Sequence, residues 1–206
     1  MDHKDYMARA LELAAQAAEH GDVPVGCVIV KDGKIVGEGR NRREEHGDAT
    51  AHAELEAIRD ADLILLGPGS LYTSVIPNLL VEGVPQAIAE TDALKIYICN
   101  IMTQDGETEG MTASDHVKAL LDHSGPGLVD LCLCNSAPVR PGLVERYREE
   151  DAAPIVVDRA AIEALGVEAV TRPLASETLN YARHSFTRLA DAVMELYNER
   201  ADTKIF

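Results

Sequence analysis

The sequence has no tryptophan, and aromatic residues make up only 4% of its 206 residues. A core without large aromatic rings must be built mainly from alanine, valine, isoleucine and leucine, and an apolar fraction of 46% supplies enough of them for a globular protein. Four cysteines are present, which does not suggest a disulfide framework in a chain of this length. They lie in apolar, strand-like runs, where buried thiols behave as small hydrophobic side chains.

Positive charge is also scarce. Nineteen lysines and arginines face 35 acidic residues, a formal net charge of −16, which argues against avid non-specific binding to nucleic acid. The longest apolar runs, such as Leu63–Leu66 and Ile96–Cys99, are too short to span a membrane. The N-terminus lacks the basic and then apolar pattern of a signal peptide. We therefore expect a cytoplasmic protein that has neither a membrane nor nucleic acid as a partner.

The first sixty residues predict a helix, a hairpin and a second helix. Residues 4–18 place apolar side chains at helical spacing. Two β-rich runs, residues 23–30 and 34–39, flank Lys31-Asp32-Gly33, and Asp-Gly between such runs is a strong hairpin signal. After a loop, residues 50–61 favour another helix.

From Asp62 onward, short apolar runs typical of buried parallel strands alternate with helical patterns: Leu63–Leu66, Ile96–Cys99, Val129–Leu133, Ile155–Val157 and Val167–Val170. Thr112 and Asp115 predict a capping box, and Asp158 is expected to cap a helix over residues 159–165. The last helix carries an apolar stripe of Phe186, Leu189, Ala190, Val193, Met194 and Tyr197. The predicted fold class is α/β, with a mostly parallel Rossmann-like sheet and flanking helices. The N-terminal hairpin is expected to extend this sheet as antiparallel edge strands.

The first candidate site begins at His52-Ala53-Glu54. The stretch VPVGCVIVKDGKIVGEGRNRREEHGDATAHAE closely resembles the tRNA adenosine deaminase branch of the cytidine deaminase-like family. These enzymes use a zinc-activated water and a glutamate that is not a ligand. The resemblance implies that Asn41 contacts the substrate, His52 binds zinc and Glu54 is the catalytic acid and base.

The zinc ligands that this family places further along the chain are missing. Where Pro-Cys-x-x-Cys is expected, the sequence reads Pro77-Asn78-Leu79-Leu80-Val81, and a lone histidine forfeits most of the binding free energy of a tetrahedral site. Cys132 and Cys134, two residues apart on a predicted strand, face the same side. Zinc is therefore expected only if other residues complete the site.

The second candidate site follows the strand Leu63–Leu66. Gly67-Pro68-Gly69-Ser70 reads as a tight turn into a helix, and glycines there let backbone amides approach an anion. The loops after two other strands, at Asn100–Thr108 and Asn135-Ser136, are rich in polar side chains. Ligands of open α/β sheets bind outside the carboxyl ends of the strands, so these loops predict one shared crevice.

The stretches LGPGSLYTSVIPNLLVEGV, CNIMTQDGETEGMTASDHV and VERYREE…PIVVD strongly resemble one family. It comprises the gluconeogenesis factors, which bind uridine-diphosphate sugars, and the related 2-phospho-L-lactate transferases of deazaflavin biosynthesis. The match runs from Asp62 to Asn198, and its motifs look more like the gluconeogenesis-factor branch. The resemblance implies a ligand site made of Gly67, Gly69, Ser70, Thr73, Asn100, Thr103, Gln104 and Asn135, with Tyr147 against the base or ribose and Arg183 on the diphosphate.

The resembling families carry further segments that are missing here. Their chains begin with a glycine-rich phosphate loop and an acidic segment, which in the transferase branch is expected to hold magnesium. We interpret the chain as a chimera of a deaminase-like fragment, residues 1–61, and a gluconeogenesis-factor-like α/β domain, residues 62–206. Three hypotheses follow: a binding protein for a uridine-diphosphate sugar or related nucleotide, an enzyme (phospholactate transferase-like, or a residual deaminase), or a chain that does neither. A homo-oligomer is left open.

Overall fold

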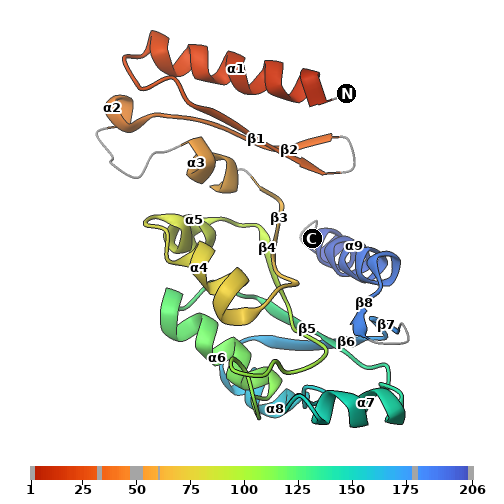
Figure 1. Ribbon diagram of the computed structural model, residues 1–206. Coiled ribbons are helices and arrows are strands. Elements are labelled where there is room, and N and C mark those ends of the chain that lie inside the picture. Colours follow the sequence, from red (N-terminus) through yellow and green to blue (C-terminus); the bar gives the residue numbers. More distant parts are fainter. Residues whose placement is uncertain (1–2, 32–33, 47–52, 60, 178–180, 204–206) are drawn as a thin grey trace. The chain divides into compact units, whose positions relative to one another are not determined.

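The computed structural model describes residues 3–31, 34–46, 53–59, 61–177 and 181–203 (Figure 1). The chain divides into two compact units. One comprises Met1–Ile64 and Leu79–Leu94, and the other comprises Leu65–Asn78 and Lys95–Phe206. The sequence-based division at residues 61 and 62 stays a prediction.

The first unit contains the predicted helix, hairpin and helix. Its elements are α1 (His3–Glu19), β1 (Gly26–Lys31), β2 (Lys34–Arg40), α2 (Arg43–His46), α3 (Ala53–Arg59) and α5 (Val84–Glu90). Strands β1 and β2 pair antiparallel as a separate two-stranded sheet. The expectation that this hairpin would extend the large sheet is therefore wrong.

Two glycines explain why the hairpin packs against helices α1 and α3. A Cβ added at Gly26 would lie 2.1 Å from the carbonyl oxygen of Ala10 in α1, and one added at Gly39 would lie 2.0 Å from that of Ala53 in α3. Helix α1 thus lies directly on β1, and helix α3 lies directly on β2. Arg9 of α1 links this helix to β2, because its guanidinium donates to both carboxylate oxygens of Glu38 at 2.9 and 2.7 Å.

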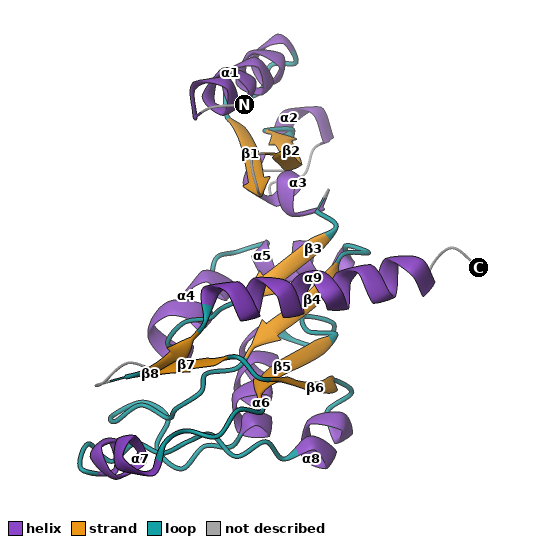
Figure 2. Cartoon of the chain, turned by 90° about the vertical axis from the view of Figure 1, so that its right-hand side faces the viewer, coloured by secondary structure: helices purple, strands orange, loops and turns teal. Residues whose placement is uncertain are grey.

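The large sheet has the strand order β3-β4-β5-β6. Its strands are β3 (Leu63–Leu66), β4 (Leu94–Ile98), β5 (Leu131–Asn135) and β6 (Glu168–Arg172). The pairs β4–β5 and β5–β6 are parallel, so the predicted α/β class is confirmed. Helices α6 (Ala113–Ser124) and α9 (Phe186–Thr203) lie on opposite faces of the sheet (Figures 1 and 2).

The other elements are a π-helical turn (Leu71–Val75), α4 (Ile76–Leu79), α7 (Pro141–Arg148), α8 (Arg159–Ala164) and the antiparallel pair β7 (Ala175–Glu177) and β8 (Ala182–His184). The predicted strand Ile155–Val157 is not a strand. It is an extended connection, in which Ile155 N donates to Ile101 O and Val156 O accepts from Ala113 N.

Two helix predictions hold and two details need correction. The capping box of Thr112 and Asp115 is formed at α6, and α8 begins after Asp158. The Asp158 carboxylate, however, accepts from Ser114 N at 2.9 Å and so caps α6 instead of its own helix. On α9 the buried side chains are Ala192, Val193 and Leu196, whereas Phe186 is 90% exposed, so the predicted apolar stripe is buried only in part. No helix within the described residues is long and apolar enough to span a membrane.

Candidate functional site

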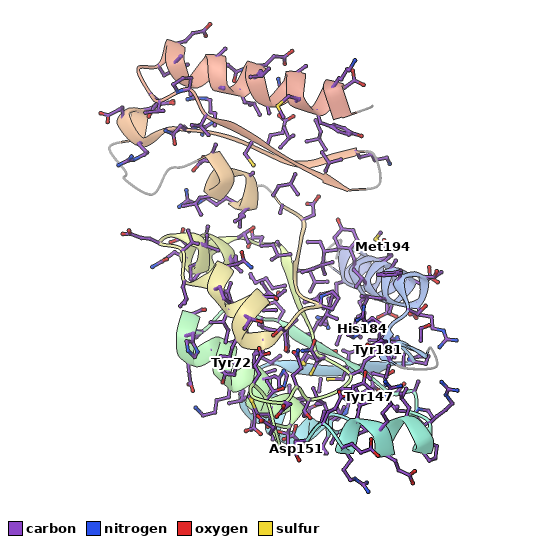
Figure 3. The ribbon with its side chains drawn as sticks, in the orientation of Figure 1. Tyr72, Tyr147, Asp151, Tyr181, His184 and Met194 are labelled. Atoms are coloured by element: carbon purple, nitrogen blue, oxygen red, sulfur yellow. The ribbon has the colours of Figure 1, made fainter. Side chains whose placement is uncertain are left out.

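A pocket of about 500 Å³ lies in the second unit, where the loop after β4 meets β8. It is lined by Pro68, Gly69, Ser70, Asn100, Ile101, Met102, Thr103, Gln104, Tyr147, Tyr181, Ala182, Arg183, His184 and Phe186. Figure 3 shows Tyr147, Tyr181 and His184 close together on this side of the unit. The pocket opens at the carboxyl end of β4, as expected for an open α/β sheet.

Hydrogen bonds and apolar contacts hold the walls of this pocket. The Tyr147 hydroxyl on α7 accepts a hydrogen bond from Ala182 N at 3.2 Å, and the Tyr147 ring packs against a small apolar cluster that includes Met102 and Leu143. Thr103 is buried, with its hydroxyl accepting from Ala153 N at 2.8 Å. Both side chains therefore shape the wall as well as facing the cavity.

The structure brings most of the predicted ligand residues to this pocket: Gly69, Ser70, Asn100, Thr103, Gln104, Tyr147 and Arg183. Gly67, Thr73 and Asn135 do not line it. Gly67 has a φ of +89° and approaches Ile98 O, which explains the glycine by backbone geometry. Thr73 donates from its hydroxyl to Ser70 Oγ at 2.6 Å.

The predicted anion cradle at Ser70 is occupied by the protein's own carboxylate. Glu107, from the loop after β4, accepts from Ser70 Oγ and from Tyr72 N, the latter at 2.6 Å. A phosphate at this turn would have to displace that carboxylate or approach it against its charge. The donors of the turn are therefore used to fix the loop that carries Thr103 and Gln104.

Arg183 supplies the positive charge of the pocket. It is the one lysine or arginine among the lining residues, and its guanidinium lies 5.0 Å from the centre of the Tyr181 ring, a cation–π distance. His184 Nε2 lies 3.2 Å from Cys99 O, and burial lowers the pKa of His184. The lining is thus neutral apart from one cation, in a chain whose formal net charge is −16.

Asn135 has a structural position. Its Oδ1 accepts from Ala137 N, Leu174 N and Ala175 N at 3.0–3.1 Å, and its Nδ2 donates to Ala137 O at 2.7 Å. The side chain joins the end of β5 to the segment that leads into β7. It therefore has little hydrogen-bonding capacity left for a ligand.

The residues of the deaminase interpretation lie in the first unit. His52 is outside the described residues, and Glu54 belongs to α3, with its side chain also outside the description. Asn41 is 3% exposed, and its Oδ1 has no hydrogen-bond partner among the described residues. Within the described part of the chain, the group with donors close enough to hold a metal ion is Cys99, Cys132 and Cys134.

Several residues at the site were not found from the sequence. Glu107 belongs to a stretch identified as polar, but nothing local indicates that its carboxylate reaches back to Ser70, 37 positions earlier. Tyr181, His184 and Phe186 enter the pocket because β7 and β8 form a hairpin. Strands of three residues give too short an alternation pattern to be predicted.

Comparisons with known proteins agree with this architecture. The family model described as 2-phospho-L-lactate transferase CofD matches residues 9–175. A gluconeogenesis factor from Halalkalibacterium halodurans is 40% identical over 180 residues, covering 85% of this chain and 56% of the relative. A crystal structure of a Bacillus halodurans protein matches with a TM-score of 0.67 at 40% identity, over 82% of this chain and 58% of the other.

The chain spans about half the length of the curated relatives it matches. A guanine deaminase structure from Bacillus subtilis also matches, over 32% of this chain, but its TM-score of 0.29 carries no argument about the fold. The family match begins at residue 9, inside the segment interpreted as deaminase-like. These comparisons do not support the chimera, which stays a hypothesis.

Proposed function

Because the chain belongs to the 2-phospho-L-lactate transferase CofD family, we propose that it binds a uridine-diphosphate sugar in the pocket beside β8, as a regulatory protein of the gluconeogenesis-factor type. The observation that carries this proposal is the neutral, aromatic lining with Arg183 as its single guanidinium. A volume of about 500 Å³ lies within the range of small-molecule sites.

The chemistry of the lining suits each part of such a ligand. Tyr147 and Tyr181 offer ring faces, and bases stack on aromatic rings. The side-chain amides of Asn100 and Gln104 make no hydrogen bond within the described residues, so they are available to base or sugar hydroxyls. Guanidinium groups form charge-assisted, paired hydrogen bonds with phosphate oxygens, which assigns the diphosphate to Arg183.

Glu107 sets the orientation of the ligand. Its carboxylate lies on Ser70 and Tyr72, so that end of the pocket repels a second anion. The diphosphate therefore belongs at the Arg183 side, and the uncharged sugar or base faces the Gly69-Ser70 turn. This assignment agrees with the role that the resemblance implies for Arg183, and it leaves the Gly69-Ser70 turn without an anion.

Isothermal titration of the full chain with uridine-diphosphate glucose tests the proposal, with uridine and inorganic phosphate as separate probes. Hydrogen bonds to charged groups contribute about 1.5–3 kcal/mol, so Arg183→Gln should weaken binding about 10- to 100-fold. Arg159→Gln removes an exposed cation of α8 that pairs with Glu163 and should change nothing. Equal affinity of wild type and Arg183→Gln, or no heat and no thermal stabilisation at millimolar ligand, would refute the proposal.

The family model's own description favours a second candidate, a 2-phospho-L-lactate transferase-like enzyme. In that function the same guanidinium would hold a phosphorylated substrate, and magnesium would bind the phosphates through oxygen ligands. Incubation with a phospholactate donor and magnesium would show the transferred product by mass spectrometry. Product formed at the same rate by wild type and Arg183→Gln would contradict the assignment of this pocket to the reaction.

A further candidate is the zinc-dependent deaminase, for which the relevant observation is the buried Asn41 Oδ1, an acceptor that has no partner among the described residues. A buried acceptor without a partner is costly and suits a site that a substrate amino group fills. The test is inosine formation from a tRNA substrate, with Glu54→Gln as the inactive control. No inosine from the wild-type chain removes this candidate.

A further inference from the structure

Three thiols, two from β5 and one from the residue that follows β4, lie close together in the second unit. Tyr97 of β4 and Cys132 of β5 are register partners in the parallel pair, and Cys99 and Cys134 each follow two positions later. Because side chains two positions apart share a face, these side chains project to the same side of the sheet. The Sγ atoms of Cys99, Cys132 and Cys134 all lie within 4.8 Å of one another, and those of Cys132 and Cys134 are 3.5 Å apart.

We propose that Cys99, Cys132 and Cys134 form a closed structural zinc site, with His116 of α6 as the fourth ligand. The cysteines are each 1% exposed or less. Tetrahedral zinc with Zn–S bonds of about 2.3 Å places its sulfur ligands about 3.8 Å apart, close to the spacing that the strands already give. Three cysteines and one histidine are a common ligand set of structural zinc.

His116 provides the independent observation. It is completely buried, its Nδ1 lies 2.9 Å from the Tyr97 hydroxyl, and its Nε2 has no partner among the described residues. A ligating histidine commonly has its other ring nitrogen in a hydrogen bond that fixes the ring and its tautomer. Tyr97 holds His116 in this way and leaves Nε2 for the metal.

A zinc ion bound among the thiols would deprotonate those that coordinate it. His116 lies outside the group of mutually close sulfurs, so zinc must draw its ring toward them. Binding converts the three thiols to thiolates and releases their protons, which leaves one net negative charge on the site.

This site is distinct from the zinc centre of a deaminase. All four proposed ligands belong to the second unit, whereas His52 belongs to the first. Variants of His52 and of the fourth cysteine, Cys27, therefore make matched controls. The site also does not depend on the ligand proposed for the pocket.

The experiment measures zinc by inductively coupled plasma mass spectrometry in the full chain purified from zinc-supplemented medium. We expect one zinc per chain in the wild type, Cys27→Ser and His52→Ala, and less than one tenth of that in Cys99→Ser and Cys134→Ser. Circular dichroism checks that each variant is folded. Loss of zinc in His52→Ala with retention in Cys134→Ser would overturn the proposal.

Cobalt titration of the apo wild type tests the cysteine ligands, and the same titration of His116→Gln tests the fourth ligand. We expect intense sulfur-to-cobalt charge-transfer bands and tetrahedral d–d bands that saturate at one equivalent, with the d–d bands shifted in His116→Gln. Absence of zinc and of cobalt binding overturns the site. Binding of Cu⁺ alone overturns the assignment to zinc, and an unchanged cobalt spectrum in His116→Gln overturns the fourth ligand.

Discussion

Replacing Asn135 separates a structural role from a ligand-binding role at the end of β5. In Asn135→Ala the backbone amides of Ala137, Leu174 and Ala175 lose their common acceptor. We expect this variant to be strongly destabilised even without any ligand. The direction follows from the cost of leaving buried donors without partners.

The burial of the three amides gives the magnitude. Leu174 is 0% and Ala175 is 6% exposed, so water does not replace the lost acceptor there, whereas Ala137 is half-buried and its amide can be hydrated. An unsatisfied buried donor costs about 1–3 kcal/mol, so two dry amides give about 2–6 kcal/mol. That is a large part of the free energy of unfolding of a typical domain, about 5–15 kcal/mol.

Urea unfolding of the full chain, followed by circular dichroism, measures this difference. Asn135→Asp is the matched control, because its carboxylate still accepts from all three amides, although its second oxygen then faces Ala137 O in place of the donating amide. We expect it to be less destabilised than Asn135→Ala, because no buried amide loses its acceptor. A destabilisation below about 0.5 kcal/mol in Asn135→Ala, within the range of ordinary surface substitutions, would refute the structural role.

Three further predictions concern other parts of the chain. Gly39→Ala places a Cβ 2.0 Å from a backbone oxygen of α3 and should lower the unfolding free energy by at least about 2 kcal/mol. Gly142→Ala in α7 adds a Cβ that has no atom within 4 Å and should raise the unfolding free energy by about 0.4–1 kcal/mol. Equal effects of the two variants in urea unfolding would contradict the close packing of α3 on β2. Burial lowers the pKa of His184, so this residue binds more protons in the unfolded chain, and its contribution makes the unfolding free energy rise from pH 5.5 to 7.5. That slope should be smaller in His184→Gln, and an equal slope would oppose the assignment. Glu107→Gln removes the negative charge on the π-helical turn and should tighten binding of inorganic phosphate, measured by calorimetry, while unchanged binding would show that no anion reaches this turn.

Local signals in the sequence predicted those features whose partners lie within a few positions. The capping box of Thr112 and Asp115 joins residues three apart, and it is formed. Asp158 looked like the same kind of signal for α8, but its carboxylate bonds Ser114, 44 positions away. A carboxylate caps whichever helix N-terminus the fold brings near, and the sequence does not show which one that is.

The same distinction applies to the pocket. Asn100, Thr103 and Gln104 could be predicted because residues that follow a parallel strand gather at one edge of the sheet, and that rule needs no knowledge of distant contacts. Glu107 on Ser70, and Tyr181 beside Arg183, depend on how a loop and a short hairpin fold back. The sequence therefore indicated the place of the pocket, and the resemblance already assigned the diphosphate to Arg183. The donors expected to approach an anion at the Gly69-Ser70 turn are instead taken by the Glu107 carboxylate.

The proposed zinc site and the proposed ligand pocket share the ends of β4 and β5. Cys99 precedes Asn100 of the pocket, and its carbonyl lies 3.2 Å from Nε2 of the pocket residue His184. Cys134 precedes Asn135, which ties the end of β5 to the segment before β7. The two cysteines face the sheet side covered by α6, while the residues after them turn outward into loops at the strand ends. A cation bound to the thiols would thus fix the ends of β4 and β5, from which the pocket is built. Zinc binding would therefore stabilise the pocket although the two sites share no ligand atom.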